Sequence, residues 1–194
     1  GDAMIRALVL LFALAAPALG QEAIVSGLSQ NRVSITADFD GSEILIYGAV
    51  KRDAPAPEGK GPLEVIVTVE GPSTAVAVRR KGRVAGIWVN NASVRVDSAP
   101  SFYAVATTGP LNHILSDTDN LRYGITIERV IRAIGISAEA DKSGEFIRAL
   151  LRVRTEDGRY RVLEGKVELT EDTLFRTDVV LPSNLTEGEY KVRL

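Results

Sequence analysis

The chain of 194 residues has no cysteine and only one histidine, so it lacks the side chains that most metal and redox sites use. Thiolates and imidazoles are the main ligands of zinc, copper and haem iron, and we therefore expect no metal and no other cofactor. Any Ser-His-Asp triad would have to use His113, and the chain contains no Gly-x-Ser-x-Gly nucleophile motif. We expect a protein that is not an enzyme.

The chain also lacks an excess of charge of either sign. Its 23 basic and 25 acidic residues give a formal net charge of −2, which offers no reason to expect nucleic acid as a partner. No glycine-rich loop precedes a predicted helix, so nucleotide binding has no support either.

The N-terminal residues read as a secretory signal peptide over residues 4–20, after an expression remnant at residues 1–3. Arg6 supplies a positive start, Ala7 to Ala16 is unbroken apolar sequence, and Ala18-Leu19-Gly20 places small residues at a cleavage site. The apolar run is shorter than the roughly 20 residues of a membrane span. A buried N-terminal helix is the alternative. Export without disulfides favours the bacterial periplasm.

Short apolar segments separated by turns fill residues 21–107, which we predict to be a β-sandwich domain. Val33 to Phe39 and Leu63 to Val69 alternate apolar and polar residues, as half-buried strands do. Ile44 to Tyr47 is apolar throughout and predicts a central strand covered on both faces. Many strands at this spacing indicate a mainly-β fold, an antiparallel sandwich of immunoglobulin-like type.

A helical insertion is predicted over residues 108–159. Ser116 can cap a short helix that ends at Gly124, Thr126 can cap a helix over Ile127–Ile134, and Ser143 can cap a third helix. The apolar residues of these segments recur at helical spacing.

Strand patterns return over residues 160–194, and they either complete the sandwich or begin a second, truncated one. The last strand alternates up to Leu194, where the chain stops without a polar tail. We expect that the natural protein continues beyond this point.

One concentrated basic patch lies at Arg79, Arg80, Lys81 and Arg83. Lys81-Gly82 reads as a tight turn between two strands, which would gather these side chains at a hairpin tip. They could contact an anion, a lipid headgroup or an acidic partner surface. Alternatively, they could protect an edge hairpin against aggregation.

Three other features invite weaker interpretations. Trp88 stands in a predicted strand, where a lone tryptophan is usually part of the core, and Asn90-Asn91 reads as a turn. The acidic residues within 38–43 resemble a fragment of a calcium loop but lack the further ligands of that motif. Those within 117–120 are better explained by the dipole at a helix start.

Several stretches together resemble a known family. They are Val78–Lys81 continuing into Arg83–Asn90, then Phe102–Ala106, and Asp172–Arg176 leading to Gly188–Val192. In order and spacing they are similar to the alphaproteobacterial family named Putative transmembrane protein. The resemblance implies a signal peptide, a periplasmic region and a C-terminal membrane helix that this sequence does not contain. Genes of this family often stand near permeases of the sulfite-exporter type, which implies an accessory role beside a transporter.

Two functions remain open from the sequence. The first is a non-enzymatic periplasmic interaction or accessory module, anchored to the inner membrane, with an integral membrane protein as partner. The second is a periplasmic solute- or carbohydrate-binding module with its site at the helical insertion. A deep cleft with converging polar groups would favour the second, and an exposed apolar patch would favour the first.

Overall fold

The computed structural model describes residues 22–26, 32–35, 42–52, 61–133 and 140–194. The mainly-β prediction is confirmed: the structure is 50% strand and 22% helix, and the strands form several sheets. The predicted expression remnant, the signal peptide and its cleavage site lie outside the described residues, as do residues 38–41 of the calcium-like segment.

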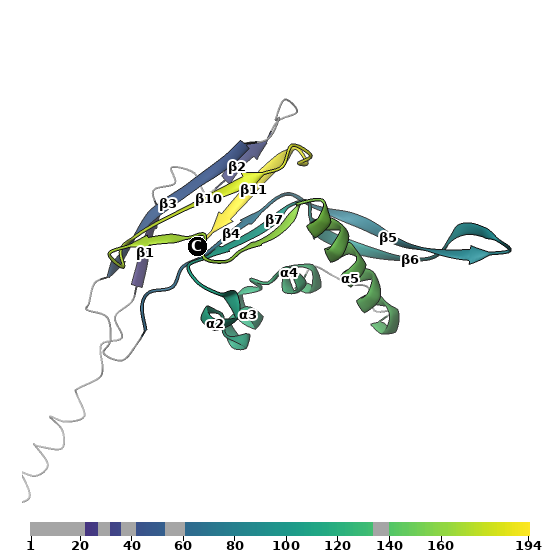
Figure 1. The fold of residues 1–194 in the computed structure, drawn as a ribbon, viewed down its shortest axis with the longest axis horizontal. Helices are drawn as coiled ribbons and strands as arrows, with labels where there is room; N and C mark the ends of the chain where they lie inside the picture. Colours follow the sequence, from purple (N-terminus) through teal and green to yellow (C-terminus); the bar gives the residue numbers. More distant parts are fainter. Residues whose placement is uncertain (1–21, 27–31, 36–41, 53–60, 134–139) are drawn as a thin grey trace, which may run out of the picture.

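A four-stranded antiparallel sheet forms the first layer (Figure 1). Its strands, in spatial order, are β1 (Glu22–Ser26), β3 (Ser42–Arg52), β10 (Leu174–Leu181) and β9 (Glu168–Thr170). Burial in β10 alternates strictly, as expected for a strand that has the core on one side. In β3, Ile46 is buried, but Leu45 and Tyr47 are 43% and 52% exposed. The prediction that this segment is covered on both faces is therefore wrong, because its sheet is an outer layer.

A five-stranded sheet forms the middle layer. Its order is β2 (Arg32–Ile35), β11 (Gly188–Arg193), β4 (Ile66–Glu70), β7 (Tyr103–Thr107) and β8 (Tyr160–Leu163). The pair β7–β8 is parallel, so the prediction of purely antiparallel sheets is wrong at this point. A parallel pair needs a crossover connection, and the helical segment between β7 and β8 supplies it.

All five residues of β7 are buried, because this strand has a core on each face. Ala104 and Ala106 belong to the core between the two sheets. Tyr103 and Val105 belong to a second core, beneath the helices. The fold is thus two sheets with a helical layer on the outer face of the second sheet, and the specific immunoglobulin-like arrangement is not confirmed.

Four described helices make the third layer: α2 (Leu111–Ile114), α3 (Asp117–Tyr123), α4 (Ile127–Ala133) and α5 (Ala140–Glu156). The predicted ends of α3 are confirmed: the Ser116 side chain accepts a hydrogen bond from the Asp119 amide, and Gly124 takes the left-handed conformation. Helix α5 begins three residues before the predicted cap Ser143, so that cap prediction is wrong. The buried residues of α4 and α5 close the second core: Ile127, Val130, Ile131, Ile147 and Leu150.

Candidate functional site

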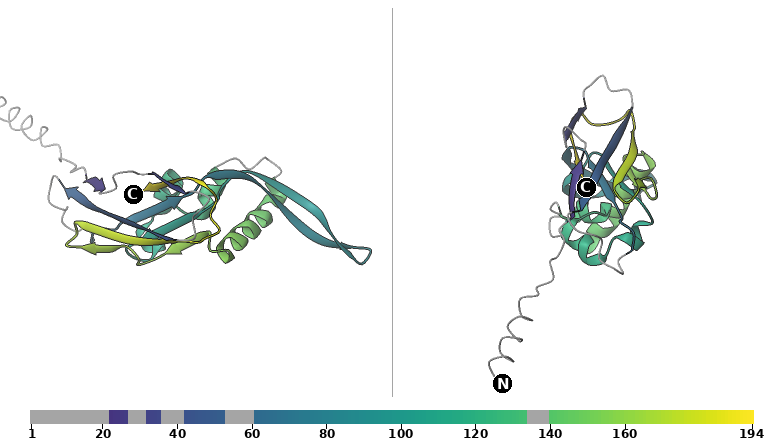
Figure 2. Two further views of the ribbon diagram at one scale, coloured as in Figure 1. Left: turned by 90° about the horizontal axis from the view of Figure 1, so that it is seen from above. Right: turned by 90° about the vertical axis from the view of Figure 1, so that its left-hand side faces the viewer.

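The two longest strands form a separate β-ribbon that projects from the layered body. Strands β5 (Ser73–Val84) and β6 (Ile87–Pro100) pair with each other along their length, and Figure 2 shows them extending beyond α5. Ala85 and Gly86 connect them, both with positive φ (48° and 85°). A two-residue hairpin turn of type I′ requires positive φ at both of its central residues. Hairpins favour this turn because its twist matches the twist of the strands.

The predicted turns at Lys81-Gly82 and Asn90-Asn91 are therefore wrong, since both pairs lie inside strands. Gly82 is not a turn residue, and a Cβ atom at this position would lie 2.0 Å from Nδ2 of Asn91. The glycine makes room for the asparagine side chain. Ala85-Gly86 is a weaker turn signal than Asn-Gly, because alanine at positive φ is strained.

The base of the ribbon is anchored on the helices. Val76, Val78 and Val96 pack into the second core with α4 and α5. Arg80 Nη1 lies 3.4 Å from Glu145 Oε2, and its guanidinium carbon lies 5.9 Å from the centre of the Phe146 ring. Arg80 therefore belongs to the anchored part of the ribbon.

A bulge at Asn91 separates the base of the ribbon from its tip. Arg80 pairs with Ala92, but the next residue, Lys81, pairs with Asn90. One extra residue in β6 shifts which side chains share a face. Because of this shift, Val89 joins the same face as Val94, although their odd spacing would put them on opposite faces of a regular strand.

We define the ribbon tip as residues 81–90. On one face, the pairs Gly82–Val89 and Val84–Ile87 present only apolar residues. On the other, Lys81 and Arg83 pair with Asn90 and Trp88. The apolar face continues the face that packs on the helices, but it has no such cover at the tip: Val84 is 55% exposed and Ile87 67%.

Trp88 is 67% exposed, so the prediction that it is a core residue is wrong. Ordinary strands of a sandwich have a core to pack against, whereas the tip of a projecting ribbon has none. The residues around Trp88 have the apolar pattern of a buried strand, and only the tertiary arrangement leaves the Trp88 side chain exposed.

The ribbon is also one-sided in charge. No aspartate or glutamate occurs between Glu70 and Asp97, whereas this stretch contains five basic residues: Arg79, Arg80, Lys81, Arg83 and Arg95. Arg79, Lys81 and Arg83 are exposed and share one face of β5, opposite the face of Arg80. The four predicted contact residues are therefore neighbours in sequence but lie on two faces. Arg79, Lys81 and Arg83 share one face, and Arg80 lies on the other, where it pairs with Glu145.

A pocket of about 440 Å³ lies between the helical segment and the two-sheet body. Tyr123 and Ile125 line it from the helical side, and Thr68 and Arg193 line it from β4 and β11. The hydroxyl of Thr68 is buried and has no hydrogen-bond partner within the described part of the chain. Most of the remaining lining is aliphatic, from Val50, Leu63, Val65, Ile66 and Leu194, with Glu64 as a further polar residue.

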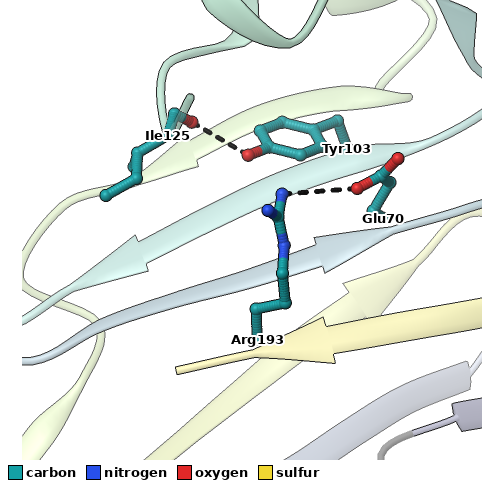
Figure 3. A network of polar contacts seen from close by, with 4 residues as sticks. All are labelled: Glu70, Tyr103, Ile125 and Arg193. Atoms are coloured by element: carbon teal, nitrogen blue, oxygen red, sulfur yellow. Dashed lines mark hydrogen bonds and ion pairs between the residues drawn. The ribbon is translucent and has the colours of Figure 1, made fainter. Parts of the chain in front are cut away.

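Figure 3 shows the polar contacts beside this pocket. The Tyr103 hydroxyl donates a hydrogen bond to the Ile125 carbonyl oxygen (2.9 Å), and Arg193 Nη2 lies 3.3 Å from Glu70 Oε2. Burial raises the pKa of Tyr103 to about 12, although Arg193 partly opposes this rise. Tyr103 is thus a neutral donor that ties the loop before α4 to the middle sheet.

The remaining candidate residues do not assemble into a reaction centre. His113 is exposed in α2. Asp119 accepts a hydrogen bond from the Ser116 hydroxyl (2.6 Å) and, with Asp117, stands in the first turn of α3. Among the described residues, no three histidine, cysteine, aspartate or glutamate side chains gather in a way that could hold a metal ion.

A family model described as Putative transmembrane protein (Alph_Pro_TM) matches residues 23–194. No curated protein and no solved structure matches the chain. None of the described helices is both long and apolar enough to cross a membrane.

Proposed function

The chain belongs to the alphaproteobacterial family described as Putative transmembrane protein (Alph_Pro_TM), and from this premise we propose that it is a non-enzymatic interaction module of the periplasm. The module is held at the inner membrane and acts beside an integral membrane protein. The observation that carries the proposal is the projecting β5–β6 ribbon, whose tip combines exposed apolar and basic side chains.

The ribbon tip contributes little to the stability of the body. Its residues are mostly exposed, and neither core cluster includes any of them. Exposing Val84 and Ile87, which share one face of the tip, is unfavourable relative to covering them, and a contiguous apolar patch usually marks a contact surface. Protection of an edge hairpin against aggregation would explain the basic residues of the tip but not its exposed apolar residues.

The partner follows from the resemblance. Genes near those of this family often encode permeases of the sulfite-exporter type, so a transporter of this type is the partner that we propose. The basic face supplies complementarity to acidic groups on such a partner, which favours encounter and orientation.

Replacing Arg79, Arg80, Lys81 and Arg83 with serine is expected to abolish co-purification of the protein with its membrane partner in detergent. The thermal stability should change little, because these side chains are exposed and a surface ion pair such as Arg80–Glu145 contributes at most about 1 kcal/mol. Affinity purification followed by mass spectrometry measures the first effect, and thermal unfolding measures the second.

A matched control removes four exposed basic residues elsewhere: Arg152, Lys166, Arg176 and Lys191. It should leave co-purification intact. A second variant that keeps Arg80 and changes only Arg79, Lys81 and Arg83 separates partner contact from the anchoring of the ribbon on α5. Co-purification that is the same for all variants would refute the proposal.

The pocket supports a second candidate function, a periplasmic module that binds a solute or carbohydrate. Its site would lie at the helical segment, where Tyr123 and Ile125 face β4 across about 440 Å³. The Arg193 guanidinium and the Glu64 carboxylate offer polar contacts within a mostly aliphatic wall.

If this second function holds, some compound in a panel of sugars and small organic acids will raise the melting temperature of the protein. Binding to the folded state alone stabilises it by about 3 kcal/mol at a hundredfold excess over Kd. The shift should disappear in Leu63→Trp, which fills the pocket, and persist in Leu121→Trp on the exposed surface of α3. A panel that produces no shift in the wild type counts against this function.

A further inference from the structure

We propose that the ribbon tip is a membrane anchor that lies in the headgroup region of an anionic lipid bilayer. This inference deepens the proposed function and rests on it for the location of the ribbon beside a membrane. It is carried by three features of the tip: an apolar face, a basic face with a tryptophan, and a size that suits shallow insertion.

The two faces of the tip have the composition of an interfacial amphipathic element. Val84, Ile87 and Val89 form the apolar face, and they are 55%, 67% and 40% exposed. Lys81 and Arg83 stand on the other face, and long basic side chains of this kind can extend their charged ends to headgroup phosphates. Surface-bound helices divide apolar and basic residues in the same way.

Trp88 is suited to the boundary between lipid and water. Its ring is apolar and its indole N–H is a hydrogen-bond donor, and tryptophan is enriched at both membrane–water interfaces for this reason. It pairs with Arg83, whose Nε donates to the Gly86 carbonyl oxygen (3.3 Å). The guanidinium is thereby held beside the turn, at the most distant part of the ribbon.

Charge favours an anionic surface. Between Glu70 and Asp97 the chain has five basic residues and no acidic residue, although its net charge is −2. Of the five, Arg80 and Arg95 form ion pairs with Glu145 and Asp97, so the attraction depends chiefly on Arg79, Lys81 and Arg83. Each lysine or arginine near an anionic leaflet strengthens binding about fivefold. A neutral or zwitterionic bilayer would attract the tip only through its apolar side chains.

The size of the tip favours lipid as the direct contact of its apolar face, which leaves the basic face to headgroup phosphates and to the acidic groups of a neighbouring membrane protein. The residues Gly82–Val89 are few compared with the roughly 20–30 residues that each side of a stable protein interface contributes. Beyond the bulge, four residues of each strand span about 10 Å from the first Cα atom to the last. That length matches the insertion depth of about 5–10 Å for interfacial elements.

The backbone also limits the depth of insertion. In the part of the chain that the structure describes, β5 and β6 pair only with each other, so the outer edge of each strand has free N–H and C=O groups. Such groups cannot enter hydrocarbon without a large penalty, whereas water and headgroups satisfy them at the interface. The ribbon is therefore placed at the surface of the bilayer and does not span it.

The fluorescence of Trp88 reports on this contact without a label, because Trp88 is the single tryptophan of the chain. With the purified protein alone, dilute samples should show the red-shifted fluorescence of a solvated indole. Vesicles of phosphatidylcholine with phosphatidylglycerol should shift the emission to the blue and protect it from iodide quenching. Vesicles of phosphatidylcholine alone should give a much weaker effect.

Two sets of variants test the two faces. Val84→Ser with Ile87→Ser should weaken vesicle binding about tenfold or more, because the apolar contact of both side chains is lost. Lys81→Ser with Arg83→Ser should weaken it about 25-fold and remove most of its dependence on salt. The matched control, Leu121→Ser with Val180→Ser, changes residues of similar exposure on α3 and β10 and should bind as the wild type does.

Three results would overturn the inference. One is the absence of any shift with either type of vesicle, and another is equal binding by the Val84/Ile87 variant and its control. The third is a blue shift that appears without lipid as the protein concentration rises, which would show that a second copy covers the tip. If vesicle binding fails while the detergent co-purification depends on the basic face, the interaction module stands and its contact is a protein.

Discussion

Replacing Tyr103 with alanine is expected to lower the free energy of unfolding by about 3–5 kcal/mol. The ring is fully buried in the second core, between the middle sheet and the helices. Its removal leaves a cavity and deprives the Ile125 carbonyl oxygen of the hydrogen bond that the Tyr103 hydroxyl donates. Urea unfolding followed by circular dichroism measures the loss.

Two comparisons separate the contributions of Tyr103. Tyr103→Phe keeps the ring and removes the hydrogen bond, so it should cost only about 1 kcal/mol. Tyr123→Ala removes a tyrosine that is 57% exposed, and its effect should stay within about 0.5 kcal/mol. If Tyr103→Ala were as mild as Tyr123→Ala, the helices would not pack on the middle sheet as the structure has them.

The protein should lose about 4 kcal/mol of stability as the pH rises from 10 to about 12, through Tyr103 and Tyr160. Burial raises the pKa of each to about 12 from the ordinary value of 10.0. The unfolded chain therefore releases these protons first, and unfolding becomes more favourable between the two values. Each unit of difference corresponds to about 1.4 kcal/mol, so the full effect is about 3 kcal/mol for each tyrosine, of which about 2 kcal/mol is lost between pH 10 and 12.

The double variant Tyr103→Phe and Tyr160→Phe isolates this effect, because phenylalanine does not ionise. Its stability should decline much less over the same pH range, with a residual decline from Tyr190, whose pKa is also raised by burial. Urea unfolding at neutral pH and at steps between pH 10 and 12 provides the comparison. Parallel pH profiles for the variant and the wild type would contradict the prediction.

Tyr160 also connects the body to the ribbon. Its hydroxyl donates a hydrogen bond to the Pro100 carbonyl oxygen (2.8 Å), at the point where β6 ends. The direction of the ribbon thus depends on a side chain of β8, which follows the helices in sequence. The base of the ribbon is thus held at Pro100 by Tyr160, and the surface ion pair between Arg80 and Glu145 adds a second contact, with α5.

Amino-acid order alone determined much of the local structure. Alternation of apolar and polar residues predicted β10 and β11, and a serine and a glycine at the correct spacing predicted the ends of α3. These features depend on neighbours within one or two turns, so their signals are local. The same holds for the basic patch, whose residues are adjacent in sequence, and for the resemblance that led to the family.

Only the tertiary structure decided the parallel pairing of β7 with β8, the exposure of Trp88 and the place of the turn in the ribbon. A pattern of apolar residues shows which side chains prefer burial, but not whether another layer reaches them. The bulge at Asn91 is the clearest case: it moves Val89 and Ile87 to the face that the helices cover only at the base of the ribbon. At the tip this face is exposed because the helices end before the ribbon does (Figure 2).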